Sequence, residues 1–224
     1  MSGKVYNGEK AIISLTSWKA RINTVAKTLY SLYTQCPGFH IVLVLSEEEF
    51  PKKEAELPET LMLFVENELI ELLWVYKNYK SFKKVLFTMD KYRDVPIISA
   101  DDDCIYTCNY AQELYDKWSE NKGCIITNDG MPYDIYKLPW GRGPNTLYPL
   151  KFSENIEDIL KILSKIDTFG DDDCFYGIFA QKMHIPYIDL HKPSYYVFHD
   201  TIEPLHERLH SLDVYIAKFK KALA

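Results

Sequence analysis

The stretch AIISLTSWKARINTVAKTLYSLYTQCPGFHIVLVL, residues 11–45, decides the fold class. Its first residues, 11–15, form a short apolar run rich in β-branched side chains, which predicts a strand. Residues 22–35 carry apolar side chains at near-helical spacing, and a Pro-Gly pair then ends the predicted helix. The run IVLVL at 41–45 is continuously apolar, as in strands that are buried on both faces of a parallel sheet. Strand, helix and strand in this order predict an α/β protein.

The same alternation continues along the chain. Further strands are predicted at 70–75, 95–99, 124–127 and 186–190, and helices at 57–69, 81–92, 110–121, 154–165 and 172–183. Residues 128–150 are rich in Pro and Gly and are predicted to be irregular, and either functional or mobile. The pattern favours one domain with an open, mostly parallel sheet and helices on both faces, whose ligands bind beyond the carboxyl ends of the strands.

The composition excludes several classes of protein. The chain has 224 residues, of which 47% are hydrophobic, and this content excludes a disordered chain. Lys and Arg number 26 against 32 Asp and Glu, which argues against binding nucleic acid through its phosphates. Five cysteines without CxxC spacing favour reduced thiols over disulfides or a zinc site. With a polar start and no transmembrane pattern, the sequence predicts a cytoplasmic protein.

Three consecutive aspartates, Asp101, Asp102 and Asp103, follow the strand predicted at 95–99. Two carboxylates about 4 Å apart repel by roughly 4 kcal/mol at an effective dielectric constant of ~20, and a divalent cation converts this repulsion into attraction. Carboxylate oxygens suit Mg²⁺ or Mn²⁺, which take their remaining ligands from substrate phosphates and water. The triplet therefore predicts a metal site, and the alternative is a solvated acidic turn that caps the next helix.

A second acidic cluster echoes the first, because Asp-Asp-Asp-Cys-Ile-Tyr at 101–106 returns as Asp-Asp-Asp-Cys-Phe-Tyr at 171–176. The second copy follows Gly170 and precedes an apolar helical pattern. This arrangement predicts a loop that delivers one carboxylate to a cleft, where it would act as a general base. The alternative is that the acids only stabilise the first turn of a helix.

Five segments resemble, in the same order, those of bacterial polysaccharide glycosyltransferases with the GT-A fold. They are residues 12–22, the helix with Ser81, Lys83 and Lys84, residues 98–106, residues 145–149 and residues 171–176. The resemblance covers roughly residues 11–200. It implies a nucleotide-sugar-binding half at 1–106, an acceptor-side half at 107–205 and a helical tail at 206–224.

The resemblance also implies roles for individual residues. The Asp-x-Asp motif of the family maps to Asp101 and Asp103, which would hold Mn²⁺ or Mg²⁺ against the diphosphate, with His199 as a further metal ligand or as a structural residue. Asp172 or Asp173 would be the base that activates the acceptor hydroxyl if the anomeric centre inverts. The residues that would face the nucleotide sugar are Thr16, Ser17, Arg21, Lys84, Asp101 and Asp102, although Lys84 alone also fits a solvated helix surface.

The expected activity is metal-dependent transfer of a sugar, from a uridine diphosphate sugar, to a glycan or lipid-linked acceptor in surface polysaccharide synthesis. Trp140, Arg142 and Tyr148 would contact a sugar or phosphate, or serve as packing anchors. The basic amphipathic tail, 206–224, is expected to be a solvated helix, or else to bind weakly to the inner face of an anionic membrane.

Two other activities fit the same residues. Residues 98–105 also resemble the motif of haloacid-dehalogenase-type phosphatases, in which Asp101 would be the nucleophile and Asp103 the acid/base. A non-catalytic module that binds a nucleotide sugar or a cation is the other alternative. Phosphate release without an acceptor would favour the phosphatase, and binding without turnover would favour the module.

Overall fold

The computed structural model describes residues 10–107, 109–128, 145–166, 172–192, 196–199 and 212–223. Its main sheet has seven strands in the order β3-β2-β1-β4-β7-β6-β8. These strands are β1 (Ile12–Thr16), β2 (His40–Ser46), β3 (Glu71–Val75), β4 (Ile97–Ser99), β6 (Ile125–Thr127), β7 (Thr146–Tyr148) and β8 (Tyr187–Asp189). All of them run in one direction except β7, which is antiparallel to both of its neighbours. The predicted α/β class with a mostly parallel open sheet is confirmed.

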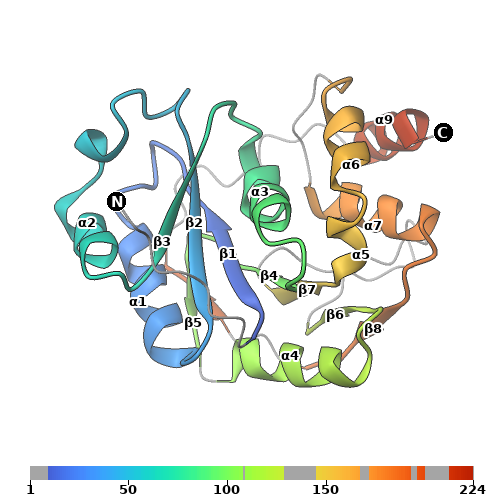
Figure 1. Ribbon diagram of the computed structural model, residues 1–224, viewed down its shortest axis with the longest axis horizontal. Helices are drawn as coiled ribbons and strands as arrows, with labels where there is room; N and C mark the ends of the chain where they lie inside the picture. The colour runs from blue at the N-terminus through green and yellow to red at the C-terminus, as the bar shows by residue number, and fades with distance from the viewer. Residues whose placement is uncertain are drawn as a thin grey trace.

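Helices cover both faces of this sheet (Figure 1). One face is covered by α1 (Val25–Gln35), α2 (Glu59–Glu66) and α4 (Tyr110–Glu120). The other face is covered by α3 (Lys83–Lys91), α5 (Leu150–Ser153), α6 (Ile156–Leu163), α7 (Asp172–Lys182) and α9 (Leu212–Leu223). Two short 3₁₀ helices, η1 (Lys53–Glu56) and η2 (Lys80–Phe82), precede α2 and α3.

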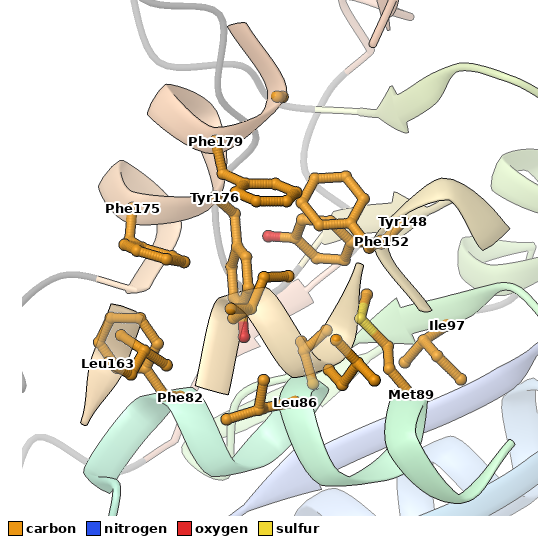
Figure 2. Packing of buried hydrophobic residues seen from close by; sticks show 14 of the residues in the cluster. Phe82, Leu86, Met89, Ile97, Tyr148, Phe152, Leu163, Phe175, Tyr176 and Phe179 are labelled. Carbon is orange, nitrogen blue, oxygen red and sulfur yellow. The ribbon is translucent and has the colours of Figure 1, made fainter. Parts of the chain in front are cut away.

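The two faces of the sheet have separate hydrophobic cores, because side chains alternate along each strand. In β1, Ile12 packs on the α3 side, whereas Ile13 and Leu15 pack on the α1 side. On the α3 side, aromatic rings join η2 to α7: the ring centroids of Phe82 and Phe175 lie 5.5 Å apart (Figure 2). This packing fixes the start of α7 beside the start of α3.

Two short strands outside the main sheet were not predicted. β5 (Cys104–Tyr106) pairs antiparallel with β9 (Tyr196–Phe198), which lies about 90 residues further along the chain. β7 was also missed, since it lies in the stretch expected to be irregular. The helix expected at 154–165 corresponds to α6, and the short helix α5 before it was not predicted. Length alone does not explain why these strands were missed, because β4, β6 and β8 also have three residues and were predicted. β5, β7 and β9 depend on pairing with distant segments, which no local pattern reports.

The apolar side chains of the C-terminal helix are used in packing. Ile216, Phe219 and Leu223 of α9 are buried, and the Phe219 ring packs edge-on against Phe175, with centroids 5.3 Å apart. The apolar side of this helix therefore covers α7 and the core, whereas Lys218, Lys220 and Lys221 are exposed, as expected of a solvated face. Within the described ranges, no helix has the length and apolar character needed to cross a bilayer.

A buried polar cluster lies where β2 and β3 begin, at the amino-terminal ends of these two strands. The Glu71 carboxylate is within 2.8 Å of His40 Nε2 and 2.7 Å of Lys91 Nζ, and it also accepts a hydrogen bond from the Tyr92 hydroxyl. Burial by itself would raise the pKa of Glu71, but these three groups together lower it to about 2. The ionised form of Glu71 therefore stabilises the folded state.

Replacing Glu71 by Gln is expected to lower the free energy of unfolding by up to about 3 kcal/mol at pH 7. A carboxylate whose pKa is lower in the folded state stabilises the protein above its unfolded pKa, and the contribution disappears as the pH falls through the folded value. The difference between wild type and Glu71→Gln should therefore shrink as the pH falls from about 4.5 towards 2. Urea unfolding at several pH values measures it, with Glu66→Gln as the exposed control. An equal difference at pH 7 and pH 2.5 would contradict the prediction.

Candidate active site

The aspartate triplet is the turn between β4 and β5, at the carboxyl edge of the main sheet. Asp102 and Asp103 are buried, and Asp101 is half-buried. The main-chain N–H of Asp101 donates to the hydroxyl oxygen of the buried Tyr106 at 2.7 Å, which holds the turn against β5. The triplet is thus a fixed part of the fold, and the solvated acidic turn considered as an alternative is wrong for two of its three residues.

Residues after β1 bind two of these carboxylates directly. Arg21 Nη1 donates to Asp102 Oδ1 at 2.8 Å and to Asp103 Oδ2 at 2.9 Å. Ser17 Oγ donates to the other oxygen of Asp102 at 2.6 Å. Because β1 and β4 are neighbouring parallel strands, the segments that follow them meet at the same edge. The structure therefore brings together Ser17, Arg21 and the triplet.

Burial shapes the protonation of this cluster. It raises the pKa of Asp102 to about 6, even though Arg21 and Ser17 favour the ionised form. Burial and the neighbouring Asp101 charge also raise the pKa of Asp103, against the effect of Arg21. For Arg21, burial lowers the pKa, but Asp102 and Asp103 raise it by more. The cluster thus holds more negative charge than the guanidinium alone offsets.

Lys84 links the two acidic clusters. It lies in the first turn of α3, where Ser14 of β1 donates a hydrogen bond to the Lys84 carbonyl oxygen. Its Nζ lies 3.0 Å from Asp101 Oδ1 and 3.3 Å from Asp172 Oδ2. Burial lowers the pKa of Lys84, but Asp101, Asp172 and Asp173 raise it well above its ordinary value. Lys84 is therefore a buried, charged bridge, and the interpretation as a solvated surface lysine is wrong.

The second acidic cluster begins α7. Asp172 and Asp173 occupy the first helical turn, where acidic side chains are favoured, and Asp171 lies outside the described residues. Asp172 is 4% exposed and faces Lys84, whereas Asp173 is half-buried. The acids therefore start a helix, as the alternative expected, and Asp172 also lies beside the triplet through Lys84, while the role of general base stays a prediction.

His199 approaches the triplet through the pairing of β5 with β9. Its main-chain N–H donates to the Asp103 carbonyl oxygen at 2.8 Å, and its Nε2 lies 2.9 Å from the hydroxyl of Thr28. Thr28 Oγ1 also lies 2.9 Å from the Asp102 carbonyl oxygen and 2.8 Å from that of Cys104. Sequence reasoning missed Thr28, whose full burial and contacts with the turn only the structure shows.

Other candidates are placed less directly. The Thr16 hydroxyl donates to the Val44 carbonyl oxygen of β2 at 2.7 Å, so it is directed at the neighbouring strand. Tyr148 is a packing anchor, because it is buried and its ring lies 5.3 Å from Phe152 between centroids. Trp140 and Arg142 lie outside the described residues.

The donor types at this edge suit Mn²⁺ or Mg²⁺, which prefer carboxylate oxygens. Among the described side chains, Arg21 and Lys84 are the basic groups that form ion pairs with the five described carboxylates of the two clusters, and the excess of negative charge favours an additional cation. The described side chains nevertheless bring no group of three His, Cys, Asp or Glu to one point that could hold a metal ion. Asp103 is bound by Arg21, and Asp101 is bound by Lys84. A metal ion at Asp101 and Asp103 would therefore have to share these carboxylates with Lys84 and Arg21 or displace them.

No protein-family model and no curated protein matches the sequence. Among solved structures, the chain is similar to a crystal structure of GalNAc-T7 with UDP, GalNAc and Mn²⁺. The identity is 15% and the TM-score 0.43 over 55% of this chain. The chain spans about a quarter of that chain's length, 24%. The activity of the present chain therefore has to follow from the geometry of its own site.

Proposed function

We propose that this chain is a glycosyltransferase that moves a sugar from a nucleoside diphosphate sugar to a hydroxyl-bearing acceptor. One observation carries the proposal: two acidic clusters about 70 residues apart share the buried cation Lys84 at the carboxyl edge of an α/β sheet. Ligands of open α/β sheets bind at this edge. The ordered resemblance of the sequence to GT-A glycosyltransferases supports the same assignment.

The basic residues suit a diphosphate leaving group. Departure of a nucleoside diphosphate develops negative charge on its phosphates, and Arg21 and Lys84 are buried cations at the strand ends. Arg21 would exchange one of its aspartate partners for a phosphate oxygen, since guanidinium pairs with either group. A bound Mn²⁺ or Mg²⁺ would supply Lewis-acid stabilisation of the same charge. Asp101 and Asp103 are the residues proposed to hold it, with His199 beside them.

Asp173 is the better candidate for the general base. A base must reach the acceptor hydroxyl, and Asp173 is half-buried, whereas the Asp172 carboxylate is buried against Lys84. We assign Asp172 to positioning Lys84 and Asp173 to deprotonating the acceptor in an inverting reaction. A uridine diphosphate sugar as donor and a surface glycan or lipid-linked glycan as acceptor complete the proposal.

Product analysis tests the assignment against its rivals. Purified protein is incubated with UDP-glucose, UDP-galactose or UDP-N-acetylglucosamine and Mn²⁺, with and without a panel of glycan acceptors, and UDP and inorganic phosphate are measured separately. Acceptor-dependent UDP release that stops in excess chelator is the expected result. In a parallel incubation with a phosphate monoester, release of inorganic phosphate, with no UDP formed from the UDP sugars, would instead indicate a phosphatase. Binding of UDP without any product would indicate the non-catalytic module.

A further inference from the structure

Two buried asparagines, Asn128 and Asn145, face each other across β6 and β7. Asn128 directly follows β6, and Asn145 directly precedes β7. The antiparallel register Thr127↔Thr146 continues to this pair, and Asn128 N donates to Asn145 O at 3.2 Å. Residues that oppose each other directly in an antiparallel pair have Cβ atoms about 4.5–5.5 Å apart on the same face. The two side chains therefore start from neighbouring positions on one face of the sheet, and no hydrogen bond joins their carboxamides.

Their side chains are buried and unsatisfied. Both residues are 0% exposed, and among the described residues none of the four side-chain N and O atoms finds a hydrogen-bond partner. Their main chains are bound, because Lys192 N donates to Asn128 O and the Thr127 hydroxyl donates to Asn145 O. Buried polar groups in folded proteins are nearly always hydrogen-bonded. Four such atoms on two paired residues indicate a partner that the described residues do not supply.

The pair lies next to the candidate active site. The register between β4 and β7, Ile98↔Leu147, continues to place Asn145 opposite Ala100, the residue before Asp101. Since β6 runs in the same direction as β4, its last residue is followed by Asn128 at the same edge of the sheet as the triplet. A molecule bound at the triplet and extending over β7 and β6 would lie next to both carboxamides, which are buried in this structure.

We propose that Asn128 and Asn145 form a subsite that hydrogen-bonds the hydroxyl groups of a sugar. Each carboxamide offers two donor hydrogens and one acceptor oxygen, and a hydroxyl group both donates and accepts. Neighbouring hydroxyls on one sugar ring therefore satisfy all four atoms. A phosphate or an ionised carboxylate only accepts and would leave both amide oxygens unpaired. This inference deepens the proposed function and rests on it, with the sugar belonging to the donor or to the acceptor.

The test replaces both asparagines by Leu, which is close to Asn in shape and has no polar atoms. Thermal unfolding is measured for the wild type, for Asn128→Leu, Asn145→Leu and the double variant, and for the control Thr127→Val. The control also removes a buried polar group from β6, but one whose hydroxyl has partners at 3.1 Å and 3.3 Å. Each protein is measured alone, with UDP and Mn²⁺, with UDP-glucose or UDP-N-acetylglucosamine and Mn²⁺, and with UDP, Mn²⁺ and free galactose, glucose or N-acetylglucosamine.

The double variant alone should have the same Tm as the wild type or a higher one, because it loses only unsatisfied groups. Thr127→Val should lose about 2–4 °C, the effect of about 1 kcal/mol in a chain of this size. In the wild type, a sugar should raise the Tm further than UDP and Mn²⁺ alone do. In the double variant this further increase in Tm should vanish, because the sugar binds at least about tenfold more weakly. If the double variant loses the further increase in Tm given by a UDP sugar, the subsite binds the donor sugar. If it loses the increase given by a free sugar, the subsite binds the acceptor.

Two results would overturn the subsite. The first is a Tm of the unliganded double variant that falls as in Thr127→Val, which would show that ordered water already satisfies the pair. The second is a sugar-dependent shift that no Leu variant reduces. Failure of the proposed function has a different signature, namely a wild type that responds to no nucleotide. In that case the subsite stands if a free sugar shifts the wild type but not the double variant, and it falls if no sugar shifts the wild type.

Discussion

Replacing Lys84 by Met is expected to lower the free energy of unfolding by about 3–5 kcal/mol and to abolish nucleotide binding. Lys84 is buried between Asp101 and Asp172, so its removal leaves two carboxylates in a poorly solvated place without their cation. The same loss removes a positive charge that the diphosphate would meet. Urea unfolding measures the first effect, and calorimetric titration with UDP and Mn²⁺ measures the second.

Lys83 provides a matched control for this prediction. It precedes Lys84 in α3, is also buried, and pairs with Glu49 at 2.7 Å outside the two acidic clusters. Lys83→Met should lower the free energy of unfolding by a similar amount, because it too leaves a carboxylate without its cation. The protein that stays folded should still bind UDP. Equal loss of UDP binding in the two variants would contradict the proposal that Lys84 binds the diphosphate. Full stability of Lys84→Met would show that the ion pairs do not form.

Asp173→Asn is expected to reduce sugar transfer by about 10²–10⁴-fold while UDP and Mn²⁺ bind as in the wild type. General base catalysis contributes a factor of this size, and Asn has nearly the same shape without the basic oxygen. The measurement compares the transfer rate and the UDP dissociation constant in the same preparation. The proton acceptor is lost, and the charge pair of Lys84 with Asp101 and Asp172 stays in place.

Asp172→Asn separates the two roles assigned to the second cluster. It removes one of the two carboxylates that hold Lys84, so it should lower stability and weaken UDP binding together with transfer. If Asp172→Asn instead lost transfer alone, and Asp173→Asn kept its full rate, the assignment of the two residues would be reversed. Full transfer in both variants would indicate a reaction that needs no base from this cluster.

The parts of the fold that the sequence predicted are those with a local signal. The β1-α1-β2 unit was predicted because a strand buried on both faces and an amphipathic helix each carry a characteristic spacing of apolar residues. β5 and β9 have three residues each, and only their pairing with each other stabilises them. Nothing within such a short segment reports a partner so far away, so these strands were not predictable.

In the candidate site, too, the residues with a local sequence signal were predicted and those without one were not. The aspartate triplet was predictable from its type and its place after β4, and Ser17 and Arg21 from their place after β1 and the resemblance. The pairing of Arg21 with Asp102 and Asp103 was not predicted, because it depends on the side-chain conformation of the folded turn. Thr28, which joins His199 to the triplet, was hidden among the buried residues of α1.

The most direct test of the central claim is thermal unfolding of the wild type and Asp103→Ala with UDP, each with and without Mn²⁺. If the acidic edge binds a nucleoside diphosphate through a divalent cation, the wild type is stabilised only when both are present. At 100 times the dissociation constant the gain is about 2.7 kcal/mol, or roughly 5–10 °C. Asp103→Ala should show no gain. A UDP shift that is the same with Mn²⁺ and with chelator, or that survives in Asp103→Ala, would contradict the claim.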